Sequence, residues 1–427
     1  MKKVHPSSVT TSGFFYKNPV LKIKEFLAFL STRFGLIFAL NMQSTILYYW
    51  VYHITNNKLS LGFVGLAEVI PAIGCSLIAG HYVDQSEKRK MVVRCLSGYL
   101  FTAICLFAIA VPFVEKKISV SLLVGLIYFF VFIGGILRSF FSPSMFSLFG
   151  LVVPREHFPN ATSWSSMSWQ MGSVLGPLVA GVFIAFFGIA AGLFAVIIVF
   201  ILIYFPLFHI TVKPILKREK EPILYSIKEG LKFVIQTPTL LAAQCLDMFS
   251  VLFGGAVALL PVYQKEILHV NEIGFGVLRA APGIGALLTL GLLAFMPLKT
   301  NPGKKLFLCV TGFALSIIVF GISTNFYLSF AMLLLSGMLD AVSVVIRSTI
   351  LQLVTPDAMR GRVSSVNTIF ISSSNEFGDF ESGVMANWLG TVRAVVVGGC
   401  LTLGVIAFTF VKVPQLRNFT FDDKKEE

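Results

Sequence analysis

Charged residues are scarce in this chain. They make up 13% of its 427 residues, whereas soluble domains carry about 25%. Hydrophobic residues reach 56%, and the mean hydropathy is +0.83. This composition excludes an ordinary soluble domain and indicates that lipid is the solvent for most of the chain.

Patterns that hold metals, disulfides or reaction centres are also missing. The six cysteines are scattered through apolar segments without a CxxC pair, and we interpret them as small buried residues. The six histidines show no metal-binding spacing, and no nucleophile elbow or phosphate-binding loop occurs. We therefore expect no catalytic residues, no metal and no bound cofactor, which argues against a membrane-embedded enzyme. Residues 1–25 also lack the apolar core of a cleavable signal peptide.

Long apolar segments are what the chain does contain. A bilayer span needs roughly 20 mostly apolar residues, and twelve such segments occur, at 26–54, 60–82, 91–114, 119–151, 161–187, 189–211, 239–264, 273–297, 306–323, 326–354, 363–388 and 392–411. The sequence therefore predicts an all-α membrane protein with twelve transmembrane helices. Its expected parts are an arm (1–25), a six-helix half (26–211), a connector (212–238), a second six-helix half (239–411) and a tail (412–427).

Lysine and arginine are unevenly distributed among the segments that join the spans. Most of the 34 lie in the arm, the connector, the tail and the loops on the same side as these. The opposite side carries five, namely Lys58, Lys116, Lys117, Lys265 and Arg393. The positive-inside rule then predicts that both termini are cytoplasmic. The net charge of +13 is thus a topology signal, and we expect no nucleic-acid partner.

The second part of the connector has apolar residues at helical spacing between positions 223 and 234. This pattern predicts an amphipathic helix along the cytoplasmic membrane face. A simple tether between the halves is the alternative.

The two halves repeat a pattern of glycine and proline. Residues 61–74 match 273–285 when Pro71 is aligned with Pro282, and residues 134–156 match 336–358 when Pro154 is aligned with Pro356. Each repeat holds six spans, so both have the same orientation, which is typical of a two-halved secondary transporter. This alignment sets Glu68 against Arg279 and Arg138 against Asp340.

Several charges fall inside the predicted spans. An unpaired charge at mid-bilayer costs on the order of 3 kcal/mol, so we expect these side chains to face one another or a wet cavity. Ion pairs that merely hold helices together are the alternative. The charges are Arg33, Arg138, Arg279, Arg347, Glu68, Asp247, Asp340, Glu376, Asp379 and Glu381.

All of these except Arg33 and Glu381 are our candidates for the substrate or proton pathway. Glu381 ranks lower because it points about 140° away from Glu376 on the same helix. Neighbouring carboxylates such as Glu376 and Asp379 suit a proton carrier. We also expect Arg138 and Asp340 to compensate each other across a central cavity.

Two motifs resemble those of the major facilitator superfamily. The segment from Gly80 to Lys90, with Asp84, Lys88 and Arg89, resembles the family's GxxxD loop, although Gln85 and Glu87 depart from it. The resemblance implies a conformational latch, for which Arg360 or Arg362 would be the partner. The segment with Gly172, Gly176, Pro177 and Gly181 looks like the fifth-helix motif of proton-coupled exporters. Close helix packing alone is the alternative there.

Longer stretches are similar to the enterobactin-exporter and macrolide-efflux branch of that superfamily. They include GLAEVIPA (65–72), RSFFSPS (138–144), VPREHFPNATSW (153–164), LDMFSVLFGGAVALLPV (246–262), VTPDAMRGRVSSVN (354–367) and SSNEFGDFESG (373–383). The resemblance implies the major facilitator fold and a monomeric inner-membrane permease that exports a siderophore or a lipophilic drug-like compound by alternating access, driven by the proton gradient. Uptake of a siderophore or another solute is the alternative. Matched charges in two repeats fit a gated binding site better than an open channel.

Overall fold

The computed structural model describes residues 19–154, 157–212, 223–295, 301–356 and 359–420. The long helices within these ranges are α2 (Lys24–Thr55), α3 (Lys58–Asp84), α4 (Lys88–Ala110), α6 (Val120–Val152), α7 (Phe158–Phe208), α9 (Pro238–Phe253), α11 (Glu272–Phe295), α12 (Pro302–Ile322), α13 (Phe326–Val354), α14 (Arg360–Leu389) and α15 (Thr391–Lys412). Shorter elements are η1 (Pro19–Lys22), α5 (Pro112–Glu115), α8 (Ile223–Gln236), η3 (Ala256–Leu259), α10 (Leu260–Val262), η4 (Tyr263–Ile267) and α16 (Pro414–Arg417).

These elements form the twelve predicted spans. Ten of the described helical stretches are long and apolar enough to cross a membrane. One of them, α7, holds two spans, because Gly188 adopts φ 83° and turns the chain back. Another span runs from α9 through η3 and α10 to η4, and the more polar α14 is the remaining one. The all-α, twelve-helix prediction is thus confirmed.

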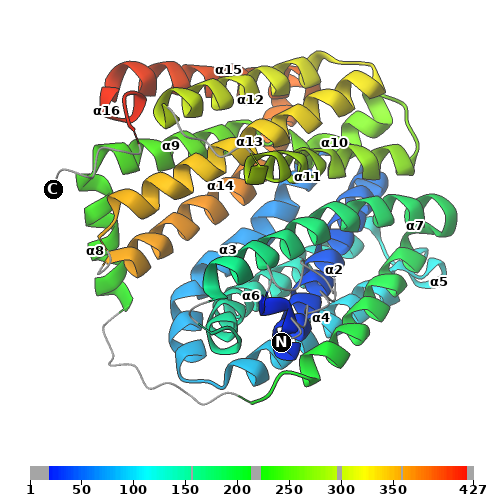
Figure 1. Cartoon of the computed structure of the whole chain (residues 1–427). Coiled ribbons are helices and arrows are strands. Elements are labelled where there is room, and N and C mark those ends of the chain that lie inside the picture. The colour runs from blue at the N-terminus through cyan, green and yellow to red at the C-terminus, as the bar shows by residue number, and fades with distance from the viewer. Residues whose placement is uncertain (1–18, 155–156, 213–222, 296–300, 357–358, 421–427) are drawn as a thin grey trace, which may run out of the picture.

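The helices pack as two six-helix halves. In Figure 1 the N-terminal half, α2 to α7, lies below the C-terminal half, α9 to α15, with α3 and α7 facing α14 and α11. We call the side with α8, the start of α2 and the end of α15 the connector side. The side with the α2–α3 turn, Gly188 and η4 is the far side.

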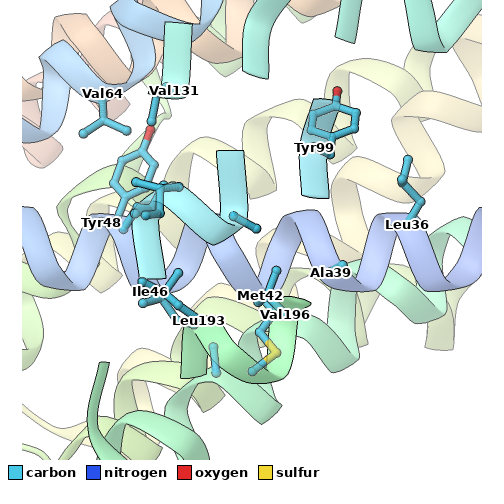
Figure 2. Packing of buried hydrophobic residues seen from close by; sticks show 14 of the residues in the cluster. Leu36, Ala39, Met42, Ile46, Tyr48, Val64, Tyr99, Val131, Leu193 and Val196 are labelled. Atoms are coloured by element: carbon cyan, nitrogen blue, oxygen red, sulfur yellow. The ribbon is translucent and has the colours of Figure 1, made fainter. Parts of the chain in front are cut away.

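Within the N-terminal half, α2 is the central helix. Met42 and Ile46 lie on the side of Leu193 and Val196 of α7, as Figure 2 shows, and all four are fully buried. Tyr48 points away from these residues, toward other helices. Its hydroxyl is therefore carried by a rigid, well-packed helix.

Matched helix crossings confirm the internal repeat. A Cβ placed on Gly98 of α4 would lie 2.5 Å from Leu137 of α6, and one on Gly312 of α12 would lie 2.8 Å from Leu339 of α13. Small residues at such crossings let helices approach closely in a membrane. The same crossing is therefore built twice.

A second pair of crossings confirms that Arg138 and Asp340 are equivalent positions. A Cβ on Gly135 of α6 would lie 2.3 Å from the carbonyl oxygen of Glu68, and one on Gly337 of α13 would lie 1.9 Å from that of Pro282. Arg138 and Asp340 each follow the crossing glycine by three residues.

The same contacts correct one part of the predicted alignment. They make Glu68 the counterpart of Pro282, whereas the sequence alignment had matched Pro71 to Pro282. The predicted equivalence of Glu68 and Arg279 is therefore wrong by three residues, about one helical turn. Close backbone approach sets the register of a crossing, and a single proline match does not reveal where that approach occurs.

The connector helix is confirmed as α8, and it is more than a tether. Its Gly230 packs on α14, where a Cβ would lie 2.7 Å from the carbonyl oxygen of Arg362. Val234 is fully buried and clusters with Leu240 of α9 and Val363 of α14. The apolar face of α8 thus docks on the C-terminal half. Its placement along the membrane surface stays a prediction.

Candidate substrate and proton pathway

The two halves touch through backbone toward the far side. A Cβ on Gly276 of α11 would lie 2.6 Å from the carbonyl oxygen of Pro177 in α7. On the other flank, a Cβ on Gly383 of α14 would lie 2.8 Å from the backbone nitrogen of Gly62 in α3. Glycines at both contacts leave no space between these helix pairs, so the halves are closed against each other there.

Polar side chains add to this closure at the far-side surface. Lys58 forms a 3.2 Å ion pair with Glu266, which also accepts a hydrogen bond from the Tyr52 hydroxyl. Lys265 donates to the Asn56 side chain at 2.6 Å. Each contact joins the N-terminal half to the C-terminal half.

A further contact of this kind lies next to them, where the Tyr49 hydroxyl donates to Glu272 at 3.0 Å. We call the whole set the far-side gate. It consists of Tyr49, Tyr52, Asn56 and Lys58 from the N-terminal half and of Lys265, Glu266 and Glu272 from the C-terminal half.

Arg279 forms the centre of a second set of contacts between the halves. Its Nη2 donates to Ser44 at 3.2 Å, and its guanidinium lies 4.8 Å from the ring centroid of Tyr48. The Tyr48 hydroxyl in turn donates to Asp379 of α14 at 2.5 Å. Arg279 and Asp379 were predicted candidates, and the structure brings them together around α2.

A second guanidinium nitrogen of Arg279, Nη1, is buried and makes no hydrogen bond with the described residues. Leaving a buried donor unsatisfied costs about 1–3 kcal/mol. Glu68 lies within electrostatic range of the same guanidinium. Attraction from Asp379 and Glu68 therefore adds to the direct contacts of Arg279 with Ser44 and Tyr48.

Glu68 and Arg138 form an ion pair within the N-terminal half. Arg138 Nη1 lies 2.8 Å from Glu68 Oε1, which joins α6 to α3, and the two side chains are 39% and 35% exposed. We had expected Arg138 to be compensated by Asp340. The structure instead pairs Arg138 with Glu68 of its own half, and Asp340 with Arg347 of its own half.

A three-residue cluster joins α9 to α13 in the C-terminal half. Arg347 forms an ion pair with Asp247 through Nη1, and its Nη2 lies 3.4 Å from Asp340 Oδ1. The two halves therefore differ in their ion pairs although their helices are related by the repeat. In the C-terminal half one arginine contacts two carboxylates.

The other charges in the spans are placed differently. The side chain of Glu376 lies outside the described part of the structure. Glu381 makes no hydrogen bond or ion pair with the described residues, and it shares a helix face with Phe377 and Trp388, which are 42% and 76% exposed. Arg33 has a buried Nε without a hydrogen-bond partner among the described residues.

Basic residues of the GxxxD-like loop contact their own half. Glu87 accepts hydrogen bonds from the backbone of Arg89 and Lys90 and so caps α4. Lys88 donates to the carbonyl of Val83, and the Arg89 guanidinium lies 5.6 Å from the ring of Phe208. The departure from the family's loop at position 87 thus has a structural role.

The predicted latch itself is not tested. The surroundings of Gly80 and the side chains of Asp84 and Arg360 lie outside the described part, and Arg362 forms an ion pair with Glu229 of α8. The latch therefore stays a prediction.

The fifth-helix motif contributes to two different contacts. Gly172 and Gly176 pack on α2, where added Cβ atoms would lie 3.0 Å and 2.8 Å from the carbonyl oxygens of Phe34 and Phe38. Gly181 instead faces α11 of the other half, 2.6 Å from the carbonyl oxygen of Glu272. Close packing explains the first two glycines, and contact between the halves explains the third.

Sequence reasoning missed the hydroxyl groups of α2. Ser44, Tyr48, Tyr49 and Tyr52 supply most of the N-terminal partners of the C-terminal charges. A usable signal was present, because three tyrosines inside one span need partners for their hydroxyl groups when buried.

Comparisons with known proteins agree with this architecture. Residues 37–425 match the model of the family described as "Transmembrane secretion effector". The enterobactin exporter EntS of Shigella boydii serotype 18 is 27% identical over 362 residues, which cover 80% of this chain and 80% of the relative. EntS of Escherichia coli strain K12 is 26% identical over the same share of both chains.

Solved structures show the same fold at low sequence identity. A D-xylose–proton symporter superposes with a TM-score of 0.73 at 16% identity and covers 92% of this chain and 99% of its own. A bacterial homologue of the iron transporter ferroportin, in an inward-facing state, gives 0.67 at 15% identity and covers 91% and 99%. Both likenesses concern the fold.

Proposed function

Because the chain belongs to the transmembrane secretion effectors, a family of major facilitator permeases, we propose that it exports a siderophore or a lipophilic drug-like compound in exchange for protons. As a permease it is a transporter and not an enzyme, it sits in the lipid bilayer, and it binds a small-molecule substrate. The relatives named as enterobactin exporters support the siderophore class.

The observation that carries the proposal is the composition of the contact between the halves. Beside apolar contacts it includes glycine backbone contacts, tyrosine hydroxyl groups and ion pairs at the far side. Polar contacts of this kind can exchange protein partners for water when the halves separate. Rocking of the two halves about a central site is the motion that alternating access requires.

The orientation follows from the charge distribution. Lysine and arginine are concentrated on the connector side, which we assign to the cytoplasm together with both termini. The chain then lies in the inner (plasma) membrane, as a monomer, and its closed far-side gate faces away from the cytoplasm. Substrate enters from the cytoplasm in this state.

Export is tested in cells grown under iron limitation. A strain that lacks this gene is compared with its parent, and siderophore in the medium and in the cells is measured by mass spectrometry. We expect less siderophore in the medium and more in the cells of the deletion strain, with both restored by the wild-type gene. Loss of uptake in the deletion strain would instead favour the import alternative.

A gate variant connects this test to the structure. Lys58→Ala removes one cation of the far-side gate, and Lys116→Ala removes a neighbouring exposed lysine outside it. Complementation should fall several-fold with the first and stay at the wild-type level with the second. Equal complementation by both variants would show that the Lys58 contact of the far-side gate is not needed for transport.

A further inference from the structure

The Asp247–Arg347–Asp340 cluster carries an unbalanced charge. One guanidinium faces two carboxylates, so the fully ionised cluster has a net charge of −1 inside the C-terminal half. In a medium of low dielectric constant a net charge is costly, and one proton removes it.

The two carboxylates of the cluster differ in their access to water. The Asp247 side chain is 13% exposed and pairs closely with Arg347. The Asp340 side chain is 45% exposed, and its oxygen lies farther from the guanidinium, at 3.4 Å. Asp340 is therefore the more weakly compensated and the more exposed of the two carboxylates.

A small cavity adjoins this cluster. It has a volume of about 10 Å³, the size of one water molecule. Its lining includes both carboxylates and the serines at positions 250 and 343, from α9 and α13. A single water there would have polar partners and would provide a route for a proton between the carboxylates.

The helices that pack against α13 bring few other titratable groups to the cluster. From α9 comes Asp247, and from α12 comes Cys309, which lines the same cavity. The charge of α11 within the bilayer is Arg279, which is directed to Ser44 of α2. On α13 itself the partner is Arg347.

The seventh span connects this cluster to the far-side gate. Asp247 lies in α9, which ends at Phe253, and the chain passes through a break at Gly254 and Gly255 before η3 begins. Ser382 of α14 donates to the carbonyl oxygen of Gly255 at 3.0 Å. Beyond the break the same span ends in η4, which carries Lys265 and Glu266 of the gate.

We propose that Asp340 is the residue that binds the exchanged proton, and that the broken seventh span transmits its protonation to the far-side gate. The proposal rests on proton-coupled transport as proposed above. A proton from water adds to a carboxylate oxygen of Asp340, and no other bond forms or breaks. Arg347 is then left to Asp247 alone, which holds α9 in the position seen in the structure.

The direction of coupling follows from this geometry. Arg347 lies closer to Asp247 than to Asp340 while the gate is closed, which is the arrangement expected when Asp340 is neutral. Loss of the proton makes Asp340 compete for Arg347 and loosens the hold on α9. Protonation thus favours the closed far side, so a proton taken up from the far side drives the return of the empty transporter.

The test measures opening of the far side without any substrate. Spin labels are attached to Lys117→Cys and Thr324→Cys, two exposed far-side positions in opposite halves, after replacement of the six native cysteines. The distance between labels is then followed over a series of pH values. In the wild-type background we expect the longer distance to gain population as pH rises, by up to about tenfold per pH unit near the midpoint.

Variants of the cluster give distinct expectations. Asp340→Asn should keep the short distance at all pH values, with less than about a twofold change per unit. Asp340→Glu should retain the response with a shifted midpoint. Asp247→Asn should favour the longer distance at all pH values, because the ion pair through which Arg347 holds α9 is then absent. This third variant keeps the test decisive if Asp340→Asn does not fold.

A matched control is available in the same half. Glu381→Gln neutralises another carboxylate within a span, one without a hydrogen bond or ion pair to the described residues, and should behave as the wild type. A wild-type response in Asp340→Asn or in Asp247→Asn would overturn the proposal. No siderophore is present in this experiment, so its outcome is independent of the export test. A pH response in a protein that exports no siderophore would support Asp340 as the proton site and contradict the proposed substrate.

Discussion

Gly181 of α7 and Gly276 of α11 lie so close that a Cβ on either would stand 3.0 Å from the Cα of the other. The two residues belong to different halves of the molecule. Their contact is therefore one that must break if the far side opens. A side chain at either position cannot be accommodated by rotamer changes, because backbone faces backbone.

A wedge at this contact should hold the far side open. Gly276→Leu is expected to leave protein in the membrane but to reduce export by at least about tenfold, since overpacking costs about 1–3 kcal/mol. Gly125→Leu is the matched control, because a Cβ there meets no atom within 4 Å. Export in complemented cells and protein level by immunoblot are the measurements. Full export with the leucine at position 276 would mean that the contact is not used.

Reversal of a gate ion pair tests the gate separately from packing. Lys58 and Glu266 have side chains 23% and 43% exposed, and pairs as exposed as this contribute about 0–1 kcal/mol. Glu266→Lys should therefore shift the ratio of open to closed far side by up to about fivefold, with little effect on thermal stability. Adding Lys58→Glu should reverse most of the shift. The label distance defined above reports it, and a shift that persists in the double variant would show that the two residues are not coupled.

Arg138 should depend on Glu68 rather than on Asp340. Arg138→Ala leaves a partly buried carboxylate unpaired at a cost of about 1–2 kcal/mol, which is below the value for fully buried pairs because both side chains are over a third exposed. Combining it with Glu68→Gln should recover part of the loss in thermal unfolding experiments. Combining it with Asp340→Asn should not. If only the Arg138→Ala and Asp340→Asn combination recovered stability, Arg138 would be paired with Asp340, as the sequence first led us to expect.

Topology can be measured with alkaline-phosphatase fusions. Fusions after Lys116 and Lys265 should be active, and fusions after Arg218 and Arg417 inactive, because the enzyme folds outside the cytoplasm. Lys116 and Lys265 lie at the far side of the structure. Activity of the Arg218 and Arg417 fusions would reverse the proposed orientation and with it the direction of the proton coupling.

The sequence predicted local features correctly where a single residue type determines the backbone conformation. The end of the fifth span at Gly188 was readable from the sequence, and the structure shows why, since φ 83° favours glycine there. The equivalence of Arg138 and Asp340 was also readable, because the surrounding pattern of small residues extends over a whole helix. The connector helix followed from its periodicity alone.

Pairing of charges was not readable in this way. The sequence led us to expect that Arg138 and Asp340 compensate each other, but the structure pairs Arg138 with Glu68 and Asp340 with Arg347. Equivalence within a repeat does not determine which side chains meet, because a difference of one helical turn already moves a side chain by about 5 Å along the helix axis.

The sequence by itself determined that this chain is a membrane protein, how many spans it has and that it consists of two related halves. A chain that crosses a lipid bilayer must pair its own backbone hydrogen-bonding groups, which few structures can do, so hydropathy and periodicity suffice to predict these features. The tertiary structure alone decided which charges meet, that Arg347 serves both Asp247 and Asp340, and that three tyrosines of α2 hold the C-terminal half. The physical reason is that ion pairs and hydrogen bonds depend on distances of a few ångströms between separate helices, and helix packing sets those distances.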